Sequence, residues 1–211
     1  MDGAKACAVD AFAAGQQIGC VRFDYSGTGS SPGSFEGSTL ATWIEDAAAV
    51  LDSLAPGPVI LVGSSMGEWI ALHLALRRSA QVVGIVGIAA APDFTDWGFG
   101  DDERRALMRD GSYQRPDPHG GDGLLTTLDF WRSGQDLRLL EEAIDILCPV
   151  RLIHGDEDEA VPVAIALRLM ERLRSSDVQL TLLKGGGHRL SEPHEIAALL
   201  TVLAALLETV R

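Results

Sequence analysis

The sequence is short of positive charge. Its 211 residues include 17 lysines and arginines against 30 aspartates and glutamates, which gives a formal net charge of −13. A surface this acidic repels phosphate backbones and anionic membrane faces, so we expect no nucleic-acid partner. The hydrophobic fraction of 46% is sufficient for one globular domain, residues 1–211, with a sizeable core.

Cysteines and long apolar runs are also scarce. Only Cys7, Cys20 and Cys148 are present, far apart and each in an apolar context. They predict small core residues in a reducing compartment, not a disulfide frame or a metal site. No apolar run is long enough to cross a bilayer, and the N-terminus lacks a basic region followed by an apolar block. We therefore expect a cytoplasmic protein without a membrane span.

The most informative stretch is residues 59–67, Val-Ile-Leu-Val-Gly-Ser-Ser-Met-Gly. A short apolar strand ends in a G-x-S-x-G turn, and a helical segment follows at once. This context is typical of a nucleophile elbow, which holds a serine at the carboxyl end of a strand. Gly63 and Gly67 occupy the two flanking positions where crowding favours small residues, so we predict Ser65 as the nucleophile. The alternative is an ordinary strand-to-helix turn capped by serines.

Helices and apolar strands alternate along the chain. The expected strands are residues 20–23, the run that begins at Val59, and residues 82–88, 149–153 and 178–183. The expected helices are residues 3–14, one capped by Ser38, residues 68–78, one that ends near Leu173, and residues 195–210. Apolar strands that alternate with helices predict an α/β fold, with a mostly parallel sheet covered on both faces.

The alternation of helices and apolar strands is interrupted over about residues 92–147, where proline, glycine and aspartate become frequent. We interpret this segment as a lid inserted over the active site. Its aromatic residues either line an apolar substrate pocket or only fix the lid to the domain, and the sequence favours neither reading. These residues are Phe94, Trp97, Phe99, Tyr113, Phe130 and Trp131.

A nucleophilic serine needs a base, and the base needs an acid that fixes its tautomer. In a fold of this kind the order along the chain is serine, acid, histidine, each after a strand. His188 follows three glycines and fits the base. Asp158 fits the acid, although a solvated acidic loop with Asp156, Glu157 and Glu159 would look the same. The other histidines are weaker candidates: His194 begins the last helix, His73 and His119 are expected to be structural, and His154 is expected to support the acid loop.

These motifs resemble those of the α/β-hydrolase superfamily, whose acid loop H-G-x-x-D-x-x-V-P matches residues 154–162 and places the acid at Asp158. Over nearly the whole chain, the sequence also resembles the palmitoyl-protein thioesterase branch, whose mitochondrial member also hydrolyses acyl glucuronides. The more specific matches are Arg-Phe-Asp-Tyr-Ser-Gly at 22–27 and Gly-Ser-Ser-Met-Gly at 63–67.

The resemblance implies a serine hydrolase of esters or acyl thioesters that acts through an acyl-enzyme on Ser65. His188 would transfer the proton, Asp158 would orient His188, and the backbone N–H of Met66 would stabilise the oxyanion. The substrate would be a small molecule or an acylated partner, with no metal or cofactor. The alternatives are a catalytically impaired binding domain, or another activity of the same scaffold such as an aminopeptidase or a C–C hydrolase.

Two departures from the family pattern stand out. Glu68 occupies a position where a small residue is common, and we expect it to affect the pocket mouth without breaking the fold. The N-terminus resembles the middle of a family motif, which implies that the family's N-terminal strands are missing, including one between the strands at Cys20 and Val59. A loop that carries a second oxyanion donor would be absent with them, at a typical cost of ~10²–10³ in rate. Our hypothesis is a start codon assigned too far downstream, which an in-frame stop just upstream of Met1 would refute.

Overall fold

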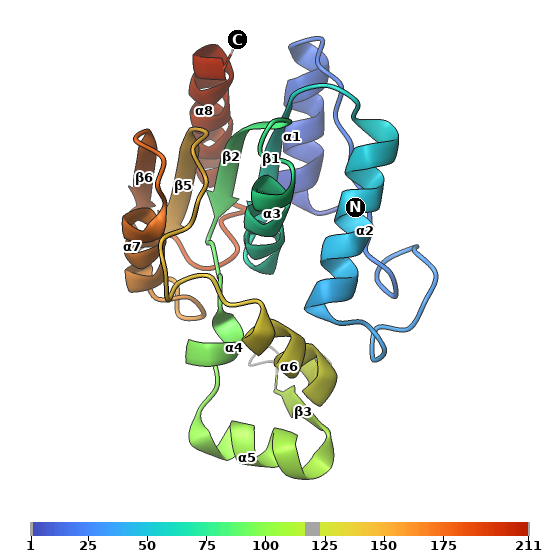
Figure 1. Ribbon diagram of the computed structural model, residues 1–211. Helices are drawn as coiled ribbons and strands as arrows, with labels where there is room; N and C mark the ends of the chain where they lie inside the picture. Colours follow the sequence, from blue (N-terminus) through green and yellow to red (C-terminus); the bar gives the residue numbers. More distant parts are fainter. Residues whose placement is uncertain (1, 117–122, 211) are drawn as a thin grey trace.

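The computed structural model describes residues 2–116 and 123–210. Its main sheet has four strands in the order β1-β2-β5-β6, and every neighbouring pair is parallel (Figure 1). The strands are β1 (Val59–Ser64), β2 (Val82–Ile88), β5 (Val150–Gly155) and β6 (Val178–Leu183). The predicted fold class, a parallel sheet with helices on both faces, is confirmed.

Helices cover both faces of this sheet. The helices of the main body are α1 (Ala4–Gly15), α2 (Leu40–Leu54), α3 (Met66–Arg77), α7 (Val163–Arg172) and α8 (Pro193–Val210). On one face, Leu72 of α3 and Leu169 of α7 share a buried cluster with Ile85 of β2. On the other face, Leu203 of α8 packs in a second cluster with Val86 of β2. The sheet is apolar on both sides because both sides are covered.

The segment between β2 and β5 projects beyond the carboxyl ends of the strands (Figure 1). It contains α4 (Phe94–Trp97), α5 (Asp101–Asp110), β3 (Ser112–Arg115), β4 (Leu124–Thr127) and α6 (Leu128–Asp136), with β3 and β4 paired antiparallel. We call this segment the insertion. The short hairpin was not predicted from the sequence, because its two four-residue strands carry no apolar run.

Two groups of hydrogen bonds fix the base of the insertion. Asp93, where the insertion begins, accepts hydrogen bonds from the backbone N–H groups of Leu139 and Leu140, at distances of 2.7–3.0 Å, where the chain returns. Trp69 Nε1 and His73 Nε2 of α3 both donate to the carbonyl oxygen of Leu137, at 3.2 and 3.0 Å. The first group therefore joins the two ends of the insertion, and the second ties the insertion to α3.

The predicted strand at residues 20–23 is wrong. These residues form no strand, and β1 is an edge of the sheet in the described chain. An extended segment becomes a strand only when its backbone groups pair with a neighbour, and no neighbour lies beside this one. The cap prediction was also one residue early, since Thr39 and not Ser38 accepts the N–H of Thr42 at the start of α2.

The prediction of three core cysteines was wrong for Cys7. Cys7 is exposed on α1, and Cys20 and Cys148 are half-buried. All three are free thiols.

Helix α8 departs from the expectation that no apolar run could cross a bilayer. By length and composition alone it qualifies, with 18 residues and a mean hydropathy of 1.4. Only 22% of this helix is buried. The buried side is formed by Leu199, Leu203 and Leu206, which pack on the sheet.

Candidate active site

Ser65 stands between β1 and α3 with a strained backbone. Its φ and ψ angles are 55° and −121°, a combination that costs a non-glycine residue about 1–3 kcal/mol. Hydrogen bonds to β2 and the loop after it fix this turn: the Ser65 N–H donates to the Ile88 carbonyl at 2.8 Å, and the Ala91 N–H donates to the Ser65 carbonyl at 3.3 Å. The turn presents the Ser65 side chain at the carboxyl end of the sheet.

The two glycines of the motif do not have equal roles. A Cβ added at Gly63 would lie 2.5 Å from the backbone nitrogen of Glu68, so a side chain is excluded there. A Cβ added at Gly67 would meet no atom within 4 Å outside its own helix. Crowding therefore explains Gly63, whereas the expectation that Gly67 must also be small does not hold in this structure.

Two loops at the carboxyl ends of β5 and β6 lie in direct backbone contact. The Asp156 N–H donates to the Leu183 carbonyl at 3.1 Å, and the Glu157 N–H donates to the Gly186 carbonyl at 3.0 Å. A Cβ on Gly155 would overlap this Gly186 carbonyl. Glycines in both loops thus allow the close approach that brings the acidic loop beside His188.

Ser65, His188 and Asp158, which are 123 and 30 residues apart along the chain, form one continuous chain of hydrogen bonds. Ser65 Oγ lies 3.1 Å from His188 Nε2, and His188 Nδ1 lies 2.9 Å from Asp158 Oδ2. A carboxylate only accepts, so Nδ1 carries the proton and Nε2 is left to accept the Ser65 hydroxyl. The His188 side chain is about one-third exposed, and the Asp158 side chain is fully buried.

Asp158 is held in its ionised form. Burial by itself raises the pKa of this carboxyl, but hydrogen bonds from His188 and from the backbone N–H groups of Val161 and Ala160 outweigh burial and lower it below its ordinary value. The two backbone bonds are 2.8 and 2.9 Å long and both reach Oδ1. The other oxygen, Oδ2, is therefore left for the imidazole, which it can both orient and stabilise when charged.

The Met66 N–H is the first amide of α3 and donates no hydrogen bond to another described residue. It lies at a helix N-terminus, where backbone N–H groups and the helix dipole favour negative charge. This is the position that the sequence suggested for an oxyanion donor.

The remaining histidines take structural positions where they are described. His154 is buried, and its Nε2 donates to the Val161 carbonyl at 2.8 Å, which holds the acidic loop. His73 bonds the insertion, and burial lowers its pKa. His194 is exposed on α8, and His119 lies outside the described residues.

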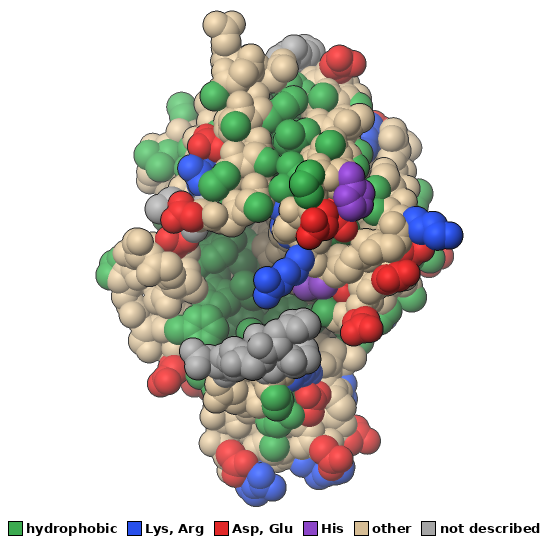
Figure 2. Space-filling view, turned by 180° about the vertical axis from the view of Figure 1, so that it is seen from behind, with side chains coloured by type: hydrophobic (Ala, Val, Ile, Leu, Met, Phe, Trp, Pro, Cys, Tyr) green, Lys and Arg blue, Asp and Glu red, His purple; other side chains and the backbone are tan. Residues whose placement is uncertain are grey.

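An apolar cavity of about 120 Å³ opens beside the nucleophile. Among the residues that line it are Phe35, Trp43, Met66, Phe94, Leu125 and Phe130. From behind, hydrophobic side chains line a hollow above the insertion (Figure 2). Phe94 and Phe130 also pack against Trp69 and Trp43, with ring centroids 5.6 and 5.5 Å apart. These two aromatics therefore line an apolar cavity and also pack the insertion against the main body.

Sequence reasoning misplaced one buried acidic residue, Glu68, and missed another, Asp93. Glu68 is fully buried on α3 and not at the pocket mouth, and Asp93 is buried where the insertion begins. Burial, followed by the nearby charge of Asp93, raises the pKa of Glu68 to about 8. The sequence shows Asp93 only as a polar residue between a strand and a helix, and nothing in it indicates the hydrogen bonds to Leu139 and Leu140.

Known proteins similar to this chain agree with the geometry. The model of the alpha/beta hydrolase family matches residues 7–199. Human mitochondrial palmitoyl-protein thioesterase ABHD10 is 35% identical over 212 residues, which cover 99% of this chain and 69% of the human protein. The mouse counterpart from the same family is 36% identical and is likewise named as mitochondrial.

Solved structures of similar proteins point to the same family. Alpha/beta hydrolase domain-containing protein 10 from mouse superposes with a TM-score of 0.94 at 35% identity, covering 100% of this chain and 86% of that one. A candidate hydrolase from Agrobacterium vitis S4 superposes with a TM-score of 0.92 at 41% identity, covering 98% and 83%. The chain therefore belongs to the alpha/beta hydrolase family and is a hydrolase.

Proposed function

We propose that the chain is a serine hydrolase that cleaves carboxylic esters or acyl thioesters through an acyl-enzyme on Ser65. The observation that carries this proposal is the pair of hydrogen bonds from Ser65 to His188 and from His188 to Asp158, at 3.1 and 2.9 Å. The names of the palmitoyl-protein thioesterase relatives support the same class of substrate.

In the proposed reaction, Ser65 Oγ attacks the acyl carbonyl while His188 Nε2 takes the hydroxyl proton. The Met66 N–H stabilises the negative charge on the carbonyl oxygen. His188 then passes its proton to the departing alcohol or thiol, and the acyl group stays on Ser65. Water, activated by the same imidazole, attacks this ester and releases the acid.

The 120 Å³ cavity beside Met66 is the proposed acyl site. Bulky aromatic side chains line it, and its volume is well below the roughly 300–1,000 Å³ of a pocket for a drug-sized ligand. We therefore propose a preference for short acyl chains while the insertion keeps the position seen here. A longer chain requires the aromatic residues Phe94 and Phe130 to move.

A fluorophosphonate probe tests the nucleophile directly. The wild-type chain should be labelled once, Ser65→Ala should abolish the label, and the neighbouring Ser64→Ala should keep it. A panel of p-nitrophenyl esters and acyl thioesters of graded chain length then tests the acyl site. Unchanged ester turnover in Ser65→Ala would remove the proposed mechanism.

A catalytically silent binding domain is the second candidate. The observation in its favour is a mainly apolar cavity of about 870 Å³ along the strand that carries the nucleophile. A chain that folds but never reacts with the probe would favour this candidate. Aminopeptidase or C–C hydrolase activity would instead give labelling without turnover of any ester or thioester.

We also propose a reducing compartment, because the three cysteines are free. The cytoplasm meets this condition. The relatives are named as mitochondrial, so the location in the cell is tested by fractionation of the cells that make this protein.

A further inference from the structure

The backbone on each side of His188 is held by a contact from elsewhere in the chain. Before His188, the carbonyl of Gly186 accepts the N–H of Glu157 from the acidic loop, at 3.0 Å. After His188, the carbonyl of Arg189 accepts a hydrogen bond from Nζ of Lys5, which lies on α1 and is 184 residues away along the chain. The contact from α1 is the one for which the proposed site gives no reason.

The residue after Arg189 has a strained backbone. Leu190 has a φ of 43°, in the left-handed region that leucine rarely adopts. It is 3% exposed and packs in a cluster with Ile153 of β5. A strained conformation persists only where the surroundings impose it. Here they are the buried leucine side chain and the two hydrogen bonds to the Arg189 carbonyl, one from Lys5 and one from Ser191 Oγ at 2.9 Å.

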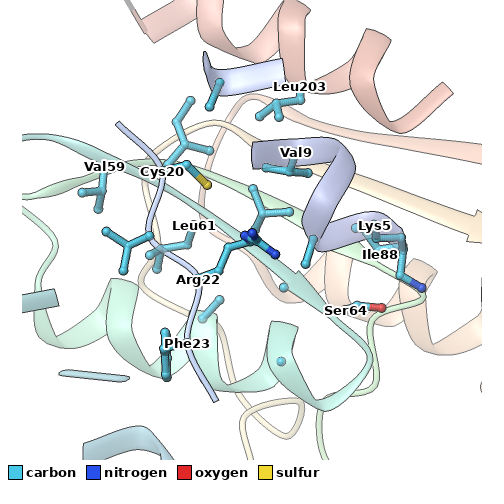
Figure 3. A pocket seen from close by; sticks show the side chains of 18 of the residues that line it. Lys5, Val9, Cys20, Arg22, Phe23, Val59, Leu61, Ser64, Ile88 and Leu203 are labelled. Carbon is cyan, nitrogen blue, oxygen red and sulfur yellow. The ribbon is translucent and has the colours of Figure 1, made fainter. Parts of the chain in front are cut away.

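Helix α1 gives Lys5 a fixed base. Val9 lies one turn further along the same face of α1, and it packs against the cluster that contains Leu203 of α8. In Figure 3, Val9 lies toward Leu203, whereas Lys5 lies toward Ser64 and Ile88, the last residues of β1 and β2. Lys5 therefore reaches from a packed helix to the carboxyl end of the sheet, where the loops of the site meet.

A carboxylate with a fixed position lies near the Lys5 ammonium. Burial lowers the pKa of Lys5, whereas the negative charge of Glu195 raises it. Glu195 is 5% exposed at the start of α8, and its carboxylate accepts the backbone N–H of Glu192 at 2.8 Å. An ammonium has three N–H donors and no acceptor, so it can donate to a carbonyl oxygen while it faces this negative charge.

We propose that Lys5 is a positioning residue for His188, which acts by holding the carbonyl of Arg189. The inference rests on the proposed function, in which the imidazole must stay within hydrogen-bond distance of Ser65 and Asp158, at 3.1 and 2.9 Å. A misplacement of about 1 Å can cost a reaction ~10²-fold in rate. Because Lys5 acts through the backbone, its removal should lower kcat and leave KM nearly unchanged.

The chain contains only two lysines, Lys5 and Lys184, which give a matched pair of variants. Lys184 is exposed and lies on the loop that leads to His188. Lys5→Met keeps an apolar side chain and removes the ammonium, and it should lower both kcat for a p-nitrophenyl ester and the rate of fluorophosphonate labelling by ~10–100-fold, with KM within about threefold. Lys184→Met removes the same charge and should match wild type. Lys5→Arg supplies donors again and should recover most of the loss.

Proton NMR gives a readout that does not depend on turnover. The proton on His188 Nδ1 resonates at low field, because its hydrogen bond to the Asp158 carboxylate is charge-assisted. This resonance should shift or broaden in Lys5→Met and stay in place in Lys184→Met. Circular dichroism shows whether each variant folds. If Lys5→Met does not fold, Lys5→Ala takes its place, since alanine favours a helix.

Equal kcat and equal labelling rates in Lys5→Met and wild type would overturn the proposal. A loss that Lys184→Met shares, or a loss confined to KM, would overturn it as well. A wild-type chain that is never labelled would instead refute the proposed function. In that case the His188 resonance would still decide whether Lys5 positions the imidazole.

Discussion

The buried side chain of Glu68 predicts that the stability of the folded protein depends on pH. Its side chain is fully buried, and neither carboxyl oxygen has a hydrogen-bond partner among the described residues. It packs closely on β2, since a Cβ at Gly87 would lie 2.7 Å from Glu68 Cγ. Burial, and then the charge of Asp93, raises the pKa of Glu68 from 4.5 to about 8. The folded protein therefore keeps Glu68 protonated at neutral pH.

The sign of the effect follows from proton linkage. Between pH 4.5 and about 8, the folded state holds a proton on Glu68 that the unfolded state has released. Raising the pH across this window therefore favours the unfolded state, at up to about 1.4 kcal/mol per pH unit. Over the whole window the loss is a few kcal/mol, with roughly 5 kcal/mol as the upper limit. Below pH 4.5 and above pH 8, Glu68 contributes no slope.

Urea unfolding of wild type and Glu68→Gln from pH 5 to pH 8.5 measures this effect. The neutral amide has nearly the same shape, so the variant should lose the slope that Glu68 causes. The difference in unfolding free energy between variant and wild type should grow with pH and level off near pH 8. Glu171→Gln, at an exposed position on α7, is the control and should follow wild type. Parallel curves for wild type and Glu68→Gln would show that Glu68 is already ionised in the folded protein.

Four further substitutions test other contacts. Gly63→Ala should lower the free energy of unfolding by about 1–3 kcal/mol or prevent folding, because its Cβ meets backbone atoms. Gly67→Ala should leave the free energy of unfolding unchanged or raise it by up to ~1 kcal/mol. Thermal denaturation measures both variants. Asparagine in Asp93→Asn tolerates the left-handed φ of 57° at this position but weakens the three hydrogen bonds that the carboxylate accepts. The variant should therefore lose about 1–2 kcal/mol in the free energy of unfolding, and limited proteolysis should cut its insertion faster. Asp158→Asn should fold normally and lower kcat by ~10³–10⁴, because the amide no longer fixes the imidazole tautomer; near-normal turnover would exclude Asp158 as the acid.

The parts of the fold that the sequence predicted well are those with a strong local cause. Strands β2 and β6 lie at the predicted residues 82–88 and 178–183, because short apolar runs between turn-forming residues permit few other structures. The elbow was visible for the same reason, since strand, small-residue turn and helix follow one another directly. The three residues expected to act together also lie within hydrogen-bond distance, because each follows the carboxyl end of a parallel strand.

The predictions that were wrong depend on contacts between residues that are distant in the sequence. Residues 20–23 have strand-forming side chains, but pairing depends on a neighbour that local propensity cannot supply. Glu68 was expected at the pocket mouth because a carboxylate suits a helix N-terminus, but the approach of β2 and Asp93 buries it. Cys7 looked like a core residue by composition, although its side of α1 faces solvent.

The strained conformation of Ser65 is fixed from one side of β1. Its backbone hydrogen bonds reach Ile88 and Ala91, which belong to β2 and to the loop after it. These contacts lie wholly within the described chain, so the elbow needs no support from the opposite edge of β1. We therefore expect Ser65 to react with a fluorophosphonate in a chain of residues 1–211. Absence of labelling in such a chain, when circular dichroism shows that it is folded, would show instead that the contacts to β2 are not sufficient to hold the elbow.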